Sequence, residues 1–185
     1  MPDEALIKAL LSQDPQRWQI LDYVRSLGLP DCWIGAGFVR NAVWDHLHGR
    51  PPAPVTGDVD VVWFDPTQLA PATDTQIEAR LRNLDFSIDW SVKNQARMHL
   101  RNADPGYAST FDALSHWPET ATAIAVRRTA TDDCDICAPF GFADLLALQV
   151  RPTPSFIGQK YPLFLDRVRQ KQWLAHWPLL KLAEP

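Results

Sequence analysis

The chain has 185 residues and a mass of 20.9 kDa, which is enough for one compact domain with a sizeable core. Its 18 basic and 22 acidic residues leave a formal net charge of −4, which excludes a general nucleic-acid coat and a polybasic membrane anchor. The 46% hydrophobic content is ordinary and the 16 prolines are dispersed, so a mainly disordered chain is also excluded.

Three features of the sequence concern membranes and the compartment. No apolar run approaches the roughly 20 residues that a membrane-spanning helix needs. The N-terminal stretch MPDEALIKALL carries acids before its short apolar part, unlike a secretory signal. Three cysteines, an odd number, argue against a disulfide framework and for a reducing compartment. We therefore expect a soluble, cytoplasmic protein with no membrane contact.

Apolar residues at helical spacing predict two helices within residues 1–28. Asp14 is suited to cap the second helix, with Pro15 at its first position, and Gly28 ends it. The N-terminal part is therefore expected to be entirely helical.

A strand, a turn and a helix come next. Residues 32–34 predict a short apolar strand that runs into Gly35-Ala36-Gly37, and the apolar positions between 39 and 47 predict a helix. Prolines mark residues 50–57 as a loop.

The rest of the chain alternates strands with helices. We predict strands at residues 58–64, 86–92, 122–126 and 134–138, and helical segments at 73–84, 94–100, 109–116 and from about 162 onward. In the second of these strands Phe86, Ile88, Trp90 and Val92 share one face, and Asp89 lies on the other face between two serines. This order predicts an α+β (mixed α/β) fold, with a mixed sheet flanked by helices in a single domain.

Asp58 and Asp60 are the first candidate functional residues. Residues two apart on a strand point to the same face, so these carboxylates project side by side and repel each other. A divalent cation between them removes the repulsion, and oxygen ligands favour Mg²⁺ or Mn²⁺. Taken alone, the pair also fits a solvated strand start beside a loop.

The turn Gly35-Ala36-Gly37 is the second candidate. Small residues between a strand and a helix let the backbone approach a phosphate, which the first N–H groups of the helix can bind. Arg40, one turn into the helix, can reach the same anion through its planar guanidinium. The alternative is an ordinary strand-to-helix turn with a surface arginine.

These motifs together carry a resemblance. Residues 36–41 (AGFVRN), 48–52 (HGRPP) and 58–62 (DVDVV) resemble the head of the CCA-adding and poly(A) polymerase catalytic domain, within the DNA polymerase beta-like nucleotidyltransferase superfamily. The whole chain is similar to a family of small bacterial nucleotidyltransferase-like proteins of unassigned substrate. The similar stretches are GAGFVRNAVWDHLHG from Gly35, DVDVVWFD from Asp58, WSVKNQARMH from Trp90, PET from Pro118, APFG from Ala138 and RPTP from Arg151.

Two residues depart from the CCA-type head. Ala36 replaces the first glycine and Asn41 replaces an aspartate. An alanine methyl group is tolerated in such a turn if its φ is negative. The change at Asn41 removes a local partner of Arg40 but leaves the arginine.

The resemblance implies one nucleotidyltransferase-like domain over residues 1–185, with N-terminal helices at 1–28, a catalytic core at 29–150 and a C-terminal helical extension at 151–185. It also implies a third acid on a neighbouring strand, close to the metal and able to accept a proton. Asp89 fits by position and face, with Asp85, Asp112 and Asp135 as rivals. The predicted catalytic and metal-binding residues are thus Asp58, Asp60 and Asp89. The predicted nucleotide-binding residues are Gly35, Ala36, Gly37, Arg40, Asn94 and Arg97.

The predicted activity is metal-dependent transfer of a nucleotidyl group from a nucleoside triphosphate (NTP) to a hydroxyl acceptor, with Mg²⁺ or Mn²⁺ as cofactor. A small molecule or a protein is favoured over RNA as acceptor, because the chain is acidic and carries no appended basic domain. A local basic cluster keeps RNA open as an acceptor; it consists of Lys93, Arg97, Arg101, Arg127 and Arg128. The alternative function is a non-catalytic nucleotide-binding or regulatory module that retains the fold.

Overall fold

The computed structural model of the chain describes residues 2–184, with the backbone alone for Pro2. The strands are β1 (Trp33–Gly35), β2 (Asp58–Trp63), β3 (Asp89–Asn94), β4 (Ala125–Arg128), β5 (Cys134–Cys137), β6 (Gln149–Val150) and β7 (Lys181–Leu182). The α-helices are α1 (Pro2–Ser12), α2 (Pro15–Ser26), α3 (Gly37–Leu47), α4 (Pro71–Leu84), α5 (Met98–Asn102), α6 (Thr110–Ser115), α7 (Ala143–Leu146), α8 (Tyr161–Lys171) and α9 (Trp173–His176). Short 3₁₀ helices cover Gln95–Arg97, Pro154–Phe156 and Gly158–Lys160.

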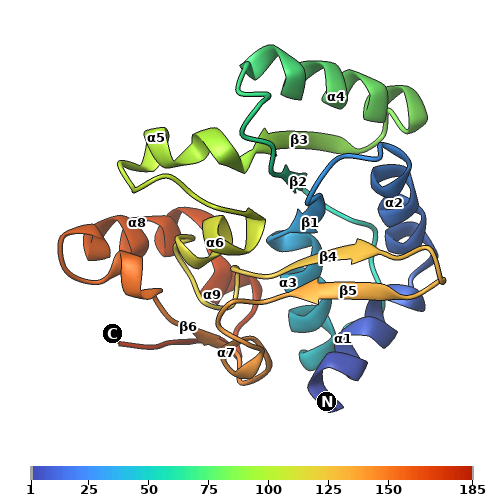
Figure 1. The fold of residues 1–185 in the computed structure, drawn as a ribbon. Helices are drawn as coiled ribbons and strands as arrows, with labels where there is room; N and C mark the ends of the chain where they lie inside the picture. The colour runs from blue at the N-terminus through green and yellow to red at the C-terminus, as the bar shows by residue number, and fades with distance from the viewer. Residues whose placement is uncertain (1, 185) are drawn as a thin grey trace.

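The central element is a five-stranded mixed sheet with the order β3-β2-β1-β4-β5 (Figure 1). Strands β2 and β3 are parallel and are connected through α4, whereas β1 pairs antiparallel with both β2 and β4. Strand β5 closes the sheet as the antiparallel partner of β4. The predicted α+β fold with a mixed sheet flanked by helices is confirmed.

The two faces of β2 have opposite characters. Val59, Val61 and Trp63 are fully buried on one face, in a core that also contains residues of α1, α2, α3 and α4. Asp58, Asp60 and Val62 alternate with them and therefore point to the other face. The same hydrophobic residues that form the core thus direct both carboxylates away from it.

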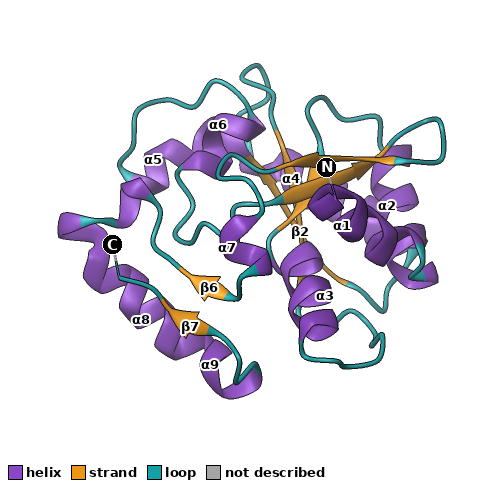
Figure 2. Ribbon diagram, turned by 90° about the horizontal axis from the view of Figure 1, so that it is seen from below, coloured by secondary structure: helices purple, strands orange, loops and turns teal. Residues whose placement is uncertain are grey.

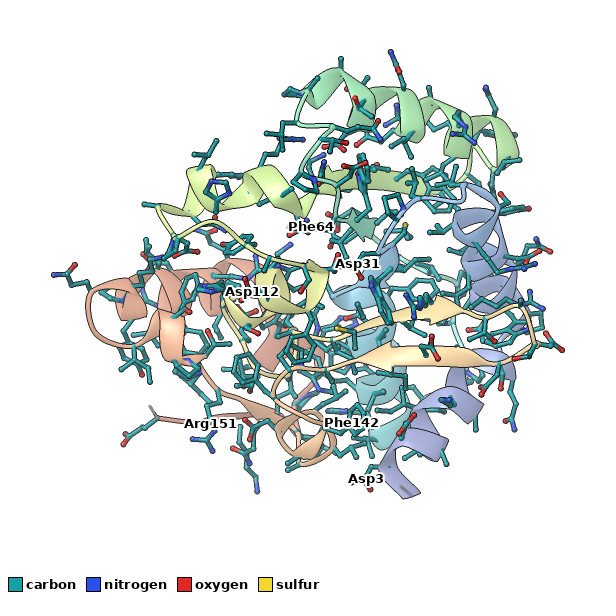
Figure 3. The ribbon with its side chains drawn as sticks, in the orientation of Figure 1. Asp3, Asp31, Phe64, Asp112, Phe142 and Arg151 are labelled. Carbon is teal, nitrogen blue, oxygen red and sulfur yellow. The ribbon has the colours of Figure 1, made fainter. Side chains whose placement is uncertain are left out.

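Helix α6 covers part of this second face. Its Leu114 packs with Trp33 and Val62 of the sheet in a small separate cluster. Asp31, labelled in Figure 3, anchors the helix: its carboxylate accepts from the Thr110 backbone N–H at 2.7 Å, and its backbone carbonyl accepts from the Thr110 hydroxyl at 2.8 Å. The strip of sheet that carries Asp58 and Asp60 stays outside this cluster.

The C-terminal elements α8, α9, β6 and β7 lie on the opposite side of the molecule from α1 and α2, in both Figure 1 and Figure 2. They share the main core, because Trp44 of α3 packs edge-on against Trp173 at 5.8 Å and against Trp177 at 5.1 Å between ring centroids. Among residues 2–184, no helix is both long enough and apolar enough to cross a bilayer.

Several predicted element ends are confirmed. The Asp14 side chain caps α2 by accepting from the Arg17 backbone N–H at 3.0 Å, and the helix begins at Pro15. Ser109 caps α6 in the same way. Caps of this kind depend on residues only three apart, so the sequence alone identifies them.

Other predicted boundaries are wrong. Strand β3 begins at Asp89, not at Phe86, because the Asp85 side chain accepts hydrogen bonds from the backbone and hydroxyl of Ser87 and forms a turn there. Phe86 is consequently 92% exposed. Strand β4 begins at Ala125, since Thr122 lies in the preceding turn.

The turn between β1 and α3 also differs from expectation. Ala36 has φ +55° and ψ −124°, so the condition of a negative φ is not met and its methyl group sits in a region that favours glycine. Gly35 is required for another reason: a Cβ there would lie 2.9 Å from the Trp117 ring. This turn is therefore a strained, tightly packed connection.

We predict that Ala36→Gly stabilises the protein by about 1 kcal/mol, because glycine removes the strain at positive φ and loses only part of that gain to backbone entropy. Ala42→Gly in the middle of α3 is the matched control and should destabilise by about 1 kcal/mol. Urea unfolding of the three proteins measures both effects. A loss of stability in Ala36→Gly as large as in the control contradicts the prediction.

Candidate active site

A cavity of about 830 Å³ opens on the face of the sheet that carries the β2 carboxylates. Its walls come from the N-terminal end of α3, from β2, from the segment around α6, and from α8 and α9. Of the predicted site residues, five line it: Ala36, Gly37, Arg40, Asp58 and Asp60.

Asp58 and Asp60 lie together in this cavity. Asp58 is exposed and Asp60 is half-buried, and within residues 2–184 neither carboxylate forms an ion pair. Burial raises the pKa of Asp60 to about 6, with a further contribution from the negative charge of Asp58; Ser91, Arg167 and Lys171 oppose the rise. The two acids thus form a site with unneutralised negative charge that suits a cation.

Asp89 lies beside this pair. In the parallel register, Asp89 is the partner of Asp58, and Ser91 is the partner of Asp60. Asp89 is exposed and is not among the residues that line the cavity. Over the described part of the chain, no three His, Cys, Asp or Glu side chains gather into a group that could hold a metal ion. The structure therefore brings two of the three predicted acids together and leaves the third next in register.

The β1–α3 turn forms one wall of the cavity. Ala36 occupies the N-cap position of α3 and provides no side-chain cap, so the first N–H groups of the helix have no capping side chain. Because Ala36 and Gly37 line the cavity, this helix end presents its positive dipole close to the carboxylates.

Arg40 is more deeply placed than predicted. Its guanidinium donates to the Asn41 side chain at 2.9 Å and to the Thr122 hydroxyl at 3.0 Å, and it packs over Trp44 and Trp173. Burial lowers its pKa to about 10; Glu119 opposes this shift and Arg167 adds to it. Asn41, which departs from the aspartate of the CCA-type head, still binds Arg40, but as a neutral acceptor.

Asn94 and Arg97 are placed outside the cavity. The Asn94 amide donates to the carbonyls of Asp65 and Gln68, both at 2.8 Å, and so holds the loop after β2. Arg97 forms an ion pair with buried Asp74 of α4. Both side chains are occupied by contacts that maintain the fold.

Several residues of the cavity were not predicted from the sequence. His116 and Trp117 follow α6, and Arg167, Lys171 and Trp173 come from the C-terminal helices. Arg167 and Lys171 are four apart and therefore share one face of α8, which is the only signal that sequence offers for them.

Most residues of the basic cluster that was considered for RNA binding form ion pairs with acidic side chains. Lys93 pairs with Glu78, Arg97 with Asp74, Arg127 with Asp135, and Arg128 with Asp22 and Asp132. Arg101 alone of the five lines the cavity without an ion pair among residues 2–184. Four of the five residues therefore offer less free positive charge to a nucleic-acid backbone than the sequence suggests.

Comparison with known proteins identifies the family and the fold. The sequence model of a family described as nucleotidyltransferase matches residues 22–182. A solved NMR structure that reveals a CCA-adding enzyme head domain is 34% identical, with a TM-score of 0.85; the match covers 97% of this chain and 95% of that one. No curated protein matches. The chain belongs to the nucleotidyltransferase family.

Larger enzymes share the fold at low identity. A CCA-adding enzyme in complex with CTP has a TM-score of 0.61 at 14% identity, and the match covers 96% of this chain and 43% of that one. The Thermotoga maritima CCA-adding enzyme in complex with tRNA has a TM-score of 0.53 at 15% identity, covering 90% and 38%. The chain spans less than half the length of these two enzymes. Family membership supports nucleotidyl transfer as the general class of activity.

The raised pKa of Asp60 makes a prediction about stability. A folded-state pKa of about 6, above the usual 3.8, means that folding favours the protonated carboxyl; the cost is absent below pH 3.8 and complete above pH 6. Asp60→Asn should therefore stabilise the metal-free protein by roughly 1–2 kcal/mol at pH 7.5, and much less at pH 4.

Thermal unfolding in EDTA at the two pH values measures this gain. Asp58→Asn is the matched control and should give a smaller gain, because Asp58 contributes only the second cause of the shift. An equal gain from Asp60→Asn at both pH values is inconsistent with an ionisation effect.

Proposed function

We propose that the protein transfers a nucleotidyl group from an NTP to a hydroxyl acceptor, with a divalent metal bound at Asp58 and Asp60. The observation that carries this proposal is the pair of carboxylates without ion-pair partners in residues 2–184, in an open cavity next to the N-terminal end of α3. A pair retained only for the fold would be expected to carry a neutralising partner.

The donor set fits a hard divalent cation. Two carboxylates on one strand face supply oxygen ligands only. The pKa of Asp60 is raised first by burial and then by the charge of Asp58, and a bound cation would offset both effects. Mg²⁺ or Mn²⁺ bound by Asp58 and Asp60 would supply charge neutralisation at the triphosphate and activation of the attacking hydroxyl. The solved relative with CTP supports an NTP as the other ligand.

The chain's own groups would bind and orient the nucleotide. The N–H groups at the start of α3 lie at the cavity wall and are suited to hold phosphate oxygens, because Ala36 and Gly37 place little side-chain bulk there. Gly35, one residue earlier, is proposed to support the turn by leaving room for the Trp117 ring. Arg40 adds positive charge behind this turn. Asp89, next in register to Asp58, is proposed to accept the hydroxyl proton.

The acceptor is proposed to be a small molecule or a protein side chain. One solved relative binds tRNA, yet four of the five basic residues considered for RNA in this chain are paired with acids. Incubation with each α-labelled NTP, Mg²⁺ or Mn²⁺ and a cell lysate identifies the acceptor as the species that gains label.

A non-catalytic nucleotide-binding module is the second candidate function. It is favoured by one observation, the lack of a three-acid group among the described residues. Metal-dependent NTP binding without label transfer to any acceptor would support it.

We predict that Asp58→Asn and Asp60→Asn each abolish Mn²⁺-dependent NTP binding and leave the fold intact, since both acids are expected to hold the metal. Asp135→Asn is the matched control, because Asp135 lies on β5, outside the cavity, and pairs with Arg127. Titration calorimetry with Mn²⁺–ATP and Mn²⁺–CTP measures the effect. If both variants bind Mn²⁺–NTP with unchanged affinity, Asp58 and Asp60 do not form a metal site.

We predict that Asp89→Asn leaves metal and nucleotide binding nearly unchanged and lowers the transfer rate by about 10²-fold or more, as loss of a general base should. Binding is measured by calorimetry and transfer by release of labelled pyrophosphate, each on the same preparation. A transfer rate equal to that of the unmodified protein excludes Asp89 from proton transfer.

A further inference from the structure

Helix α8 presents two cations to the cavity, opposite the β2 carboxylates. Arg167 and Lys171 are four residues apart, share one face of the helix and line the cavity. Asp58 and Asp60 line the same cavity, so the two cations and the two carboxylates border one space. Arg169 lies on another face, with a side chain that is 73% exposed and paired with Asp166 at 3.3 Å.

A buried acid holds Arg167 in place. Glu119 is 1% exposed, and its Oε1 atom accepts from Arg167 Nε at 2.8 Å. The Glu119 backbone is fixed by a bridge to Pro152 and by accepting from the N–H groups of Thr122 and Ala123. Only Nε of Arg167 is occupied in this way; among residues 2–184 its two terminal nitrogens have no hydrogen-bond partner. The forked end of the guanidinium is therefore available to a ligand.

Arg40 is not equivalent to Arg167. Arg40 is 6% exposed, its Nε and both terminal nitrogens already donate to Asn41 and Thr122, and it lies 4.4 Å from the Trp173 ring. Arg167 packs against the same ring at 5.6 Å with its terminal nitrogens unbound.

Glu119 leaves this region positively charged. Three cations line the cavity here, Arg40 from α3 and Arg167 and Lys171 from α8. The single carboxylate of Glu119 neutralises one of these charges, so two net positive charges remain. The wall is thus built for an anion with more than one negative charge.

We propose that Arg167 and Lys171 bind the β- and γ-phosphates of the NTP, and that Glu119 is the positioning residue for Arg167. This phosphate site rests on the nucleotidyl transfer proposed above. In that reaction the acceptor oxygen bonds to the α-phosphorus, the bond from the α-phosphorus to the bridging oxygen breaks, and its electron pair leaves on pyrophosphate. The acceptor proton passes to Asp89. Arg167 and Lys171 stabilise the charge that develops on the departing pyrophosphate.

The test compares two arginines of one helix. Binding of inorganic tripolyphosphate with Mg²⁺ is measured by titration calorimetry for the unmodified protein, Arg167→Ala and Arg169→Ala. We expect at least a 10-fold loss of affinity in Arg167→Ala and less than a 2-fold change in Arg169→Ala, although both remove one positive charge. Cytidine and adenosine binding should be unchanged in both variants.

Two results overturn the phosphate site. The first is equal tripolyphosphate affinity in Arg167→Ala and the unmodified protein, including no binding by either. The second is an equal loss in Arg167→Ala and Arg169→Ala, which would show that only the overall charge of the protein matters. Tripolyphosphate binding that depends on Arg167, without nucleotidyl transfer to any acceptor, would keep the phosphate site and refute the proposed function instead.

A second pair of variants tests the positioning role of Glu119. Glu119→Ala should lower tripolyphosphate affinity, and Glu119→Gln should restore it, because a glutamine oxygen can still accept from Arg167 Nε. Equal losses in the two variants, or no loss in Glu119→Ala, overturn positioning by Glu119. Circular dichroism confirms the fold of each variant, and the Arg167 comparison stands if Glu119→Ala does not fold.

Discussion

The alternation of side chains along β2 is the constraint on which the rest of the structure depends. Val59, Val61 and Trp63 are fully buried against helices, and the register with β3 places Val61 opposite Val92. A slip of one residue would bury Asp58 and Asp60 in this core and expose the apolar side chains, at a cost far above the stability of a domain of this size. The hydrophobic effect therefore sets the direction of both carboxylates, and α6 leaves the strip of sheet around them uncovered.

The cavity gathers features that are unfavourable for the free protein. Asp60 is half-buried beside another negative charge, Ala36 holds a positive φ, and Arg40 is buried deeply enough to lower its pKa. Each of these costs folding free energy, and a domain with no function at this place would be expected to lose them. A bound cation would offset the repulsion between the acids, and phosphate oxygens would satisfy the N–H groups at the start of α3. The residues that destabilise the free protein are thus the ones that the proposed metal and phosphates would contact or neutralise.

The sequence was sufficient where the structure is determined by neighbours along the chain. The Asp14 and Ser109 caps and the β2 strand are set by short-range pattern and alternation. The sequence was insufficient where a side chain binds a residue that is distant along the chain. Asn94 and Arg97 look like site residues in a polar run, but Asn94 binds residues 26 and 29 positions earlier and Arg97 binds one 23 positions earlier. The φ of Ala36 depends on packing between β1 and α3, which no residue pattern reports.

The C-terminal helices show why a cavity wall can be missed although its residues are plain in the sequence. Arg167 and Lys171 are ordinary basic residues on an amphipathic helix until Trp173 and Trp177 pack against Trp44 and bring α8 to the sheet. Because these tryptophans belong to the main core, the backbone of α8 that carries both cations is fixed beside the sheet. Cations and carboxylates on opposite walls of an open cavity cost little folding free energy, since both remain in contact with water. The same charges attract a ligand that carries both a metal ion and phosphates. The core that directs the carboxylates outward on β2 thus also holds the cations that face them.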